Sequence, residues 1–368
     1  MHRLTQPLPP GATIGILGNG QLGRMMALAA ARLGYRTHVF GPDKDSPAEQ
    51  VAGMSTVAAY EDNAALVQFA ATVDAVTFEF ENVPVKSVQQ LAERLPVRPD
   101  PRILEIAQDR INEKQFFASI GAATPAWAIV SHRTDLESAV KITGTPAVLK
   151  TARFGYDGKG QAKVKTPSDA DTAWTAVTGG KTAGHDGFAV LEAFVDFQCE
   201  ISVLVARGQD GQVVCFEPAE NDHANHILST STVPARVAPK TIETALGIAT
   251  RAAEALDLVG LLAVEMFVTP TGEVLCNEMA PRPHNSGHWT MDAGGVDQFE
   301  QLIRAVAGLP LVSSVRHADV TMVNLIGDDV HKLDGYLKDP AARIHLYGKR
   351  EARPGRKMGH VNLLRKKT

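Results

Sequence analysis

The feature that most constrains the fold is a pair of apolar segments, residues 261–264 and 274–276, joined by a short turn and each followed by a glutamate. The turn, Thr-Pro-Thr-Gly at residues 269–272, predicts a β-hairpin. Antiparallel strands would place Glu265 and Glu278 side by side, where two carboxylates repel and are costly to bury. A divalent cation removes that cost, and Mg²⁺ commonly takes one or two carboxylates plus phosphate oxygens. The alternative is a hairpin with two solvated glutamates.

A loop rich in polar groups follows the second segment. Residues 277–288 read Asn-Glu-Met-Ala-Pro-Arg-Pro-His-Asn-Ser-Gly-His and combine a carboxylate, a guanidinium and two imidazoles. Loops of this kind at strand ends are usual places for chemistry in α/β proteins.

The N-terminal part alternates strand and helix patterns. Residues 13–18, 36–40 and 75–80 predict strands, and residues 21–33 predict a helix that stops at a glycine. This alternation indicates a parallel sheet with crossover helices. The proline-rich segment 96–101 marks a domain boundary.

Gly18, Gly20 and Gly23 fit the G-x-G-x-x-G pattern between a strand and a helix, and Asp43 lies about 20 residues further on. By itself this pattern would suggest NAD or FAD. A sugar phosphate or a ribonucleotide would equally use a close glycine backbone and the free N–H groups of a helix N-terminus. A tight turn without a ligand also satisfies the pattern.

Glu79 and Glu81 end a later strand of the same predicted sheet. Ligands in open parallel sheets bind beyond the carboxyl ends of the strands. These glutamates are therefore candidates to bind sugar hydroxyls or an amine, with a solvated loop as the alternative.

The rest of the chain mixes both element types. Helices are expected at 103–120, 168–176 and 239–256, and strands at 147–150, 164–165, 189–195, 200–205 and 320–325.

A glycine-rich loop, residues 155–161, follows the strand that ends in Lys150. It lacks the Walker A pattern but is suited to fold over phosphates, whose charge Lys150 and Lys159 would neutralise. An ordinary glycine-rich hairpin is the alternative. Residues 192–195 have the form of a hinge strand whose backbone pairs with an adenine edge, and Glu200 would hold ribose hydroxyls.

Composition narrows the class of protein. A chain of 368 residues exceeds one ordinary core, so two or three domains are expected. The net charge of -4 argues against nucleic-acid binding. Three cysteines without zinc spacing indicate a reducing cytoplasm. No apolar run approaches the roughly 20 residues that cross a bilayer, so no membrane segment is expected.

The order of these elements resembles the ATP-grasp superfamily, and within it the 5-(carboxyamino)imidazole ribonucleotide synthase family, the ATPase subunits of aminoimidazole ribonucleotide carboxylase. The most specific matches are residues 154–161 and 277–288. The resemblance implies an α/β ATP-grasp architecture with a Rossmann-like parallel-sheet domain at 1–105. A central α+β ATP-grasp region would follow at 106–310, with a lid subdomain at about 150–215. A small C-terminal domain at 311–368 would contact the substrate phosphate.

The activity implied is the ATP- and bicarbonate-dependent carboxylation of the exocyclic amine of 5-aminoimidazole ribonucleotide through carboxyphosphate, in purine biosynthesis. This is a ligase reaction that uses Mg²⁺ and yields ADP and phosphate. No biotin is expected, because no Ala-Met-Lys-Met-like acceptor is present. The family also suggests a cytoplasmic homodimer.

The resemblance assigns roles residue by residue. The ATP contacts would be Arg110, Lys150, Gly155, Tyr156, Asp157, Gly158, Lys159, Gly160, Gln161, Glu192, Ala193, Phe194, Val195, Glu200, His223, Asn277 and Glu278. The ribonucleotide contacts would be Gly20, Gln21, Leu22, Glu79, Tyr156, Arg282, His284, Asn285, Ser286, Lys349, Arg356 and Lys357. Glu265 and Glu278 would hold Mg²⁺, and Arg282, Lys159 and Lys150 would be catalytic.

One departure concerns the metal. Many superfamily members carry Glu-x-Asn after the second carboxylate, whereas this chain has Ala280, which cannot be a ligand. Water or Asn277 would take that place, so the number of protein ligands stays open.

Three other functions remain to be distinguished. The first is another ATP-grasp carboxylate–amine ligase, such as a formate-dependent glycinamide ribonucleotide transformylase. The second is a nicotinamide-dependent oxidoreductase built on Gly18 to Gly23, and the third is a non-catalytic nucleotide-binding regulator. The basic segment 349–357 is either a solvated charge run or, given its Pro-Gly, a shaped turn for a phosphate monoester.

Overall fold

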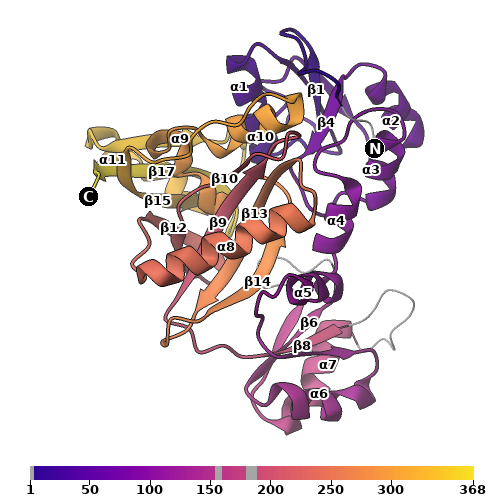
Figure 1. The fold of residues 1–368 in the computed structure, drawn as a ribbon, viewed down its shortest axis with the longest axis vertical. Coiled ribbons are helices and arrows are strands. Elements are labelled where there is room, and N and C mark those ends of the chain that lie inside the picture. Colours follow the sequence, from indigo (N-terminus) through magenta and orange to yellow (C-terminus); the bar gives the residue numbers. More distant parts are fainter. Residues whose placement is uncertain (1–3, 154–159, 180–188) are drawn as a thin grey trace.

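The computed structural model describes residues 4–153, 160–179 and 189–368 and arranges them around three β-sheets (Figure 1). The first sheet is parallel, in the order β3-β2-β1-β4, as predicted. Its strands are β1 (Thr13–Leu17), β2 (Arg36–Gly41), β3 (Met54–Val57) and β4 (Ala75–Phe78), with helices α1 (Gln21–Arg32), α2 (Asn63–Ala70) and α3 (Val85–Ala92). Strand β1 is buried along its whole length, as expected of a parallel strand covered on both faces.

The second sheet, which has nine strands within the described residues, is antiparallel and runs β14-β13-β9-β11-β12-β15-β17-β16, with β10 beside β9. Its strands are β9 (Cys199–Arg207), β10 (Val213–Cys215), β11 (Ala219–Ala224), β12 (Ile227–Val233), β13 (Gly260–Val268), β14 (Val274–Ala280), β15 (Ala318–Ile326), β16 (Ala342–Leu346) and β17 (Lys357–Lys366). The pairing of β12 with β15 makes the C-terminal strands a continuation of this sheet.

Two helices cover opposite faces of the second sheet. Side chains alternate between the two faces of a strand. Leu204, Leu261 and Ala263 therefore pack in the core that contains α10 (Gln298–Ala307). Their neighbours in sequence, such as Val203 and Leu262, pack in the core that contains α8 (Pro239–Ala255). Glu265 shares the parity of Leu261 and Ala263, so it lies on the α10 face, beyond the end of that core.

The third sheet is antiparallel in the order β5-β8-β6-β7 and forms the lower unit of Figure 1. It contains β5 (Trp127–Val130), β6 (Ala147–Thr151), β7 (Gln161–Val164) and β8 (Ala189–Ala193), with α6 (Leu136–Thr143) and α7 (Ala170–Thr178) packed on it. The remaining short elements are η1 (Arg133–Asp135), η2 (Pro167–Asp169), η3 (Asn285–Gly287), α9 (Thr290–Ala293), η4 (Gly327–His331) and α11 (Asp334–Lys338).

The prediction of one helix over residues 103–120 is wrong. Two helices occupy this stretch, α4 (Pro101–Ala107) and α5 (Arg110–Ser119). Asp109 between them is extended, with φ -126° and ψ 112°, and its carboxylate accepts hydrogen bonds from the N–H groups of Ile111 and Asn112. Asp109 is thus an N-cap that restarts the helix.

Within the described ranges, none of the helices combines the length and the apolar character required to cross a membrane.

Candidate active site

The hairpin predicted to bring two glutamates together is present. Glu265 on β13 and Glu278 on β14 are direct partners in the antiparallel register. A β-bulge follows, because the next pair is Met266 with Cys276, so Asn277 has no partner opposite it. Bulges re-aim side chains next to functional sites.

The two carboxylates have different neighbours. Oε1 of Glu265 lies 2.9 Å from Nε2 of His284. Burial by itself would raise the pKa of Glu265, but His284, His223 and Arg282 outweigh burial and hold that pKa at about 2. The Glu278 side chain is 42% exposed, and its Oε2 lies 3.5 Å from Nη1 of Arg110.

The donor set of the hairpin fits a hard cation. Glu265 and Glu278 supply carboxylate oxygens, and Oδ1 of Asn277 is buried without a hydrogen-bond partner in the described part of the chain. No group of three or more His, Cys, Asp or Glu side chains suited to a metal occurs among the described residues. Two carboxylates with an amide oxygen are appropriate for Mg²⁺, which keeps waters and takes phosphate oxygens for its remaining positions.

Helix α5 contributes three charged side chains on one face, because residues three and four apart are neighbours on a helix. Arg110 reaches Glu278, Glu113 accepts a 2.6 Å hydrogen bond from the N–H of Met279, and Lys114 is fully buried. Glu113 and Lys114 were not identified from the sequence. Their spacing from Arg110, directly after the Asp109 cap, is the signal that could have found them.

A buried ion cluster links α5 to the third sheet. One carboxylate oxygen of Glu192 accepts a 2.8 Å hydrogen bond from Lys150, and the other lies 3.2 Å from Nζ of Lys114. Burial by itself would raise the pKa of Glu192, but the three cations Lys150, Lys114 and Arg110 hold it at about 2. Burial lowers the pKa of Lys150, while Glu192 counteracts this effect. The predicted ATP contacts Lys150, Glu192 and Arg110 thus lie together.

The predicted hinge, residues 192–195, begins within β8, which ends at Ala193 rather than at Val195. The N–H groups of Ala193 and Phe194 donate to the carbonyls of Ala126 and Pro146. Phe194 is 49% exposed. An adenine edge would therefore meet the end of the hinge, around Val195.

Glu200 and His223 are brought together from β9 and β11, with 2.7 Å between Glu200 Oε2 and His223 Nδ1. Burial alone would lower the pKa of His223, but the hydrogen bond to Glu200 outweighs it and raises that pKa. The imidazole that contacts Glu200 would restrain that carboxylate for the ribose contact predicted for it.

Five residues of the predicted lid lie outside the described residues, namely Gly155, Tyr156, Asp157, Gly158 and Lys159. Its last two residues are described. Gly160 has φ +70°, and its carbonyl accepts a 2.8 Å hydrogen bond from the N–H of Thr151. Gln161 pairs with Lys150 across β6 and β7, so the last residue of the loop lies beside Lys150.

The glycine-rich turn before α1 is occupied by a side chain of the protein itself. The N–H groups of Gly20 and Gly23 donate to the two carboxylate oxygens of Glu79, which follows β4. The expectation that these helix N-terminal N–H groups are free is therefore wrong. A Cβ on Gly18 would lie 2.2 Å from Cγ of Glu79, so glycine is required for this close approach. A dinucleotide pyrophosphate at this turn would have to displace Glu79. Gln21 and Leu22 open α1 beside it.

Arg282 and Glu81 form a partly buried ion pair. Burial alone would raise the pKa of Glu81, but Arg282 outweighs it and lowers that pKa. Nη1 of Arg282 also donates to the carbonyl of Pro283 at 2.8 Å. This ion pair therefore connects the polar loop that follows β14 of the second sheet to the end of the first sheet.

The remaining predicted contacts of this loop are His284, Asn285 and Ser286. His284 lies 2.8 Å from the hydroxyl of Ser286, which accepts a 2.6 Å hydrogen bond from Ser202. Asn285 is only 8% exposed, yet neither polar atom of its side chain has a hydrogen-bond partner in the described structure. Buried polar groups are nearly always satisfied, so this amide indicates a ligand contact.

The basic segment lies against the first domain. Nζ of Lys349 donates to the carbonyl of Lys357 at 2.7 Å, and Arg350 pairs with Asp45 at 3.0 Å. Burial and Arg356, against the opposing effect of Glu79, lower the pKa of Lys349 to about 8. Lys349, Arg356 and Lys357 are thus half-buried, with Lys349 close enough to Glu79 to feel its charge, whereas Arg350 and Arg353 of the same segment are exposed.

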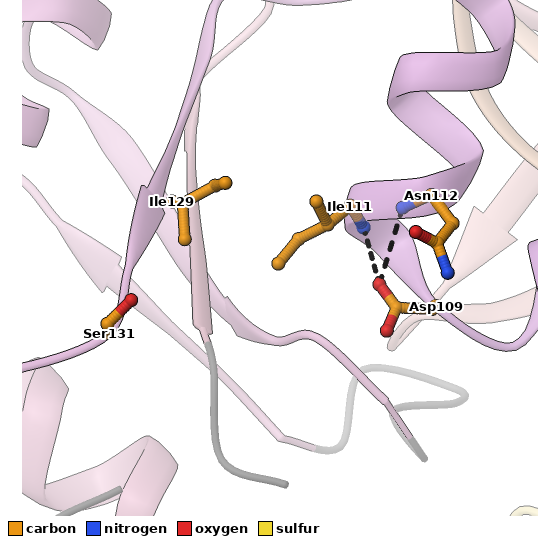
Figure 2. A pocket seen from close by; sticks show the side chains of 5 residues that line it. All are labelled: Asp109, Ile111, Asn112, Ile129 and Ser131. Atoms are coloured by element: carbon orange, nitrogen blue, oxygen red, sulfur yellow. Dashed lines mark hydrogen bonds between the residues drawn. The ribbon is translucent and has the colours of Figure 1, made fainter.

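A separate hollow of about 340 Å³ lies between α5 and β5 (Figure 2). Ile111 and Ile129 face each other across it, and Asp109, Asn112 and Ser131 complete the lining. Asp109 already caps α5. Among the described residues that line the hollow, the one carboxylate is therefore already engaged in capping the helix.

Comparison with protein families assigns three segments of the chain. Residues 11–108 match the ribonucleotide synthetase preATP-grasp domain, residues 115–299 the ATP-grasp domain, and residues 320–368 the phosphoribosylaminoimidazole carboxylase C-terminal domain.

Individual proteins are similar over nearly the whole chain. The N5-carboxyaminoimidazole ribonucleotide synthase of Brucella melitensis is 49% identical, with 98% of each chain covered. The corresponding synthetase structure from Thermus thermophilus is 44% identical, with a TM-score of 0.87 and coverage of 96% and 93%. An Aspergillus clavatus N5-carboxyaminoimidazole synthase structure in complex with ADP and 5-aminoimidazole ribonucleotide is 28% identical, with a TM-score of 0.89 and coverage of 97% and 94%.

Proposed function

Because this chain belongs to the N5-carboxyaminoimidazole ribonucleotide synthase family, we propose that it carboxylates the exocyclic amine of 5-aminoimidazole ribonucleotide. It is an ATP-grasp ligase of purine biosynthesis that forms a C–N bond and uses ATP. Bicarbonate attacks the γ-phosphorus of ATP, which releases ADP and forms carboxyphosphate. The amine then attacks the carboxyl carbon, or the CO₂ released from it, and phosphate and one proton leave.

The in-register pair Glu265–Glu278 carries this proposal, because the two halves of the site meet there. Arg110, from the ATP side, contacts Glu278, and His284, from the ribonucleotide side, contacts Glu265. The γ-phosphate of ATP, placed above this pair, would lie between the rest of the nucleotide and the amine of the ribonucleotide. Phosphoryl transfer requires positioning and charge neutralisation more than covalent chemistry.

Each group of side chains has a separate task in this scheme. Lys150, with Lys159 of the lid, neutralises phosphate charge, and Arg282 holds bicarbonate or carboxyphosphate. Glu265, Glu278 and Asn277 would hold Mg²⁺, which supplies Lewis-acid neutralisation of the phosphate oxygens when bound. Lys349, Arg356 and Lys357 bind the substrate phosphate, and residues 155–161 exclude water from labile carboxyphosphate.

A coupled assay of ADP release tests the proposal. ADP formation should depend on bicarbonate and Mg²⁺ and should increase with the ribonucleotide, whose carboxylation is followed with ¹⁴C-bicarbonate. Dependence on formate and glycinamide ribonucleotide would instead identify the transformylase activity. ADP release without ¹⁴C incorporation would contradict carboxylation. The proposed homodimer is tested by sedimentation equilibrium, and the proposed cytoplasmic location by fractionation of cells.

A further inference from the structure

The loop that carries His284 is held from behind by one buried side chain. Gln298, at the start of α10, has no exposed surface. Its Oε1 accepts a hydrogen bond from the N–H of His284, and its Nε2 donates to the carbonyl of the same residue, both at 2.8 Å. Only one orientation of the amide satisfies both contacts, because the backbone N–H can only donate and the carbonyl can only accept.

The same amide also contacts the end of the loop. Nε2 of Gln298 lies 3.0 Å from Nδ1 of His288, which therefore accepts. Burial lowers the pKa of His288 well below its ordinary value, in agreement with a neutral ring whose Nδ1 accepts. Gln298 thus holds both ends of residues 284–288.

Packing leaves this loop little room to move. The hydroxyl of Thr290 donates to the carbonyl of Gly287 at 2.6 Å and accepts from the N–H of Gln298 at 3.0 Å. A Cβ on Gly287 would lie 2.4 Å from Cδ2 of Leu204 and 2.8 Å from Oε1 of Gln298. The loop therefore lies directly on the core beneath it.

We propose that Gln298 is a positioning residue for the ribonucleotide, which acts by fixing the backbone of His284 and so the aim of His284, Asn285 and Ser286. Both polar atoms of Gln298 are used within the loop, so it acts through that loop and does not contact the ligand. The inference rests on the proposed function, because the loop is the proposed ribonucleotide contact.

The same helix offers a matched control. Gln301 is also fully buried and also clamps one backbone residue, because its Nε2 donates to the carbonyl of Val312 at 2.7 Å and its Oε1 accepts from the N–H of Val312 at 3.3 Å. Val312 belongs to the connection between α10 and β15 and carries none of the proposed ligand contacts.

The test compares Gln298→Met with Gln301→Met. Gln298→Met loses three amide hydrogen bonds and Gln301→Met loses two, so both should unfold at lower temperature. Only Gln298→Met should raise the KM for the ribonucleotide, by about tenfold or more, with the KM for ATP within about twofold of wild type. Equal KM values for the ribonucleotide in the two variants would overturn the inference.

Gln298→Glu keeps the inference testable if Gln298→Met does not fold. A protonated glutamic acid has the shape of glutamine, and its carbonyl oxygen and single O–H keep both contacts to the His284 backbone while the donor to His288 is lost. Burial favours that protonated form. In Gln298→Glu, the KM for the ribonucleotide should therefore be close to that of wild type at low pH. As the pH rises, this KM should increase more than the KM of wild type does. Gln301→Glu should follow the wild-type trend, and the same pH profile in both Glu variants would contradict the inference.

Wild-type measurements separate the two levels of proposal. A wild-type protein without ribonucleotide-dependent carboxylation overturns the proposed function and this inference with it. An active wild type whose Gln298 and Gln301 variants behave alike overturns only the role of Gln298.

Discussion

Buried carboxylates around the site differ in protonation because their neighbours differ. Cations surround Glu192 and Glu265 and hold both pKa values at about 2. Burial and the nearby Glu278 raise the pKa of Glu113 to about 8, although Arg110 and Lys114 oppose the increase. Near neutral pH the site therefore contains both ionised and protonated carboxyl groups within one network.

The raised pKa of Glu113 predicts a specific dependence of stability on pH. Between the ordinary value of 4.5 and about 8, the folded protein holds a proton that the unfolded chain has lost, so this group destabilises the fold as pH rises. Glu113→Gln retains an acceptor for the Met279 N–H and removes the carboxyl group that titrates. The variant should match wild type near pH 5 and melt at a higher temperature at pH 8.5, as measured by calorimetry. A constant difference across this range would contradict the assignment.

Glu278→Gln should reduce ATP turnover by about 100-fold or more, because the metal site loses one of its two carboxylates. Bicarbonate-dependent ADP release, measured across a Mg²⁺ titration, checks this outcome. Glu273→Gln, at an exposed position of the same hairpin, is the control and should behave as wild type. Unchanged turnover in Glu278→Gln would refute the metal role.

At the level of elements, α5 joins the nucleotide groups of two sheets. Its first N–H, that of Arg110, donates to the carbonyl of Ala152 after β6 at 2.9 Å, while Glu113 holds β14 through Met279. The place where α5 begins therefore decides where Arg110 and Lys114 point. The amphipathic pattern of residues 103–120 indicates helix throughout, and only the extended backbone of Asp109 divides it.

Asp109→Ala should destabilise the protein by about 1 kcal/mol, the usual effect of losing an N-cap, and should also raise the KM for ATP. Asp100→Ala is a matched control, because Asp100 caps α4 through the N–H of Arg102 at 2.8 Å. Urea denaturation should show similar losses for both variants. An ATP KM that changes equally in both would show that α5 has no special role.

At the level of the molecule, the site is assembled from three distant parts of the chain. Residues 110–278 hold the proposed nucleotide groups, whereas the proposed ribonucleotide groups other than Tyr156 come from the first domain, the loop 282–286 and the C-terminal segment 349–357. The continuous second sheet and the contacts of Arg350 with Asp45 and of Gln50 with Gly348 bring these parts together.

This division predicts that substitutions separate the two substrates. Lys357→Ala should raise the KM for the ribonucleotide by about tenfold and leave the KM for ATP nearly unchanged, since a phosphate loses one charged contact. Lys366→Ala, exposed near the end of the same strand, is the control. Steady-state kinetics in both substrates measures the effect. Equal changes in both KM values would argue against a substrate-phosphate role.

The sequence by itself determined the features that depend on local order. Strand–helix alternation established the parallel sheet, and two apolar segments with a turn established the pairing of Glu265 with Glu278. Tertiary structure alone decided which charges compensate one another. Burial and distance set the electrostatic energies of these groups, and the spacing of residues along the sequence encodes neither. Glu79 therefore accepts hydrogen bonds from the glycine turn, which lies 56 to 59 residues earlier in the sequence. Gln298 likewise binds the backbone of His284, 14 residues earlier.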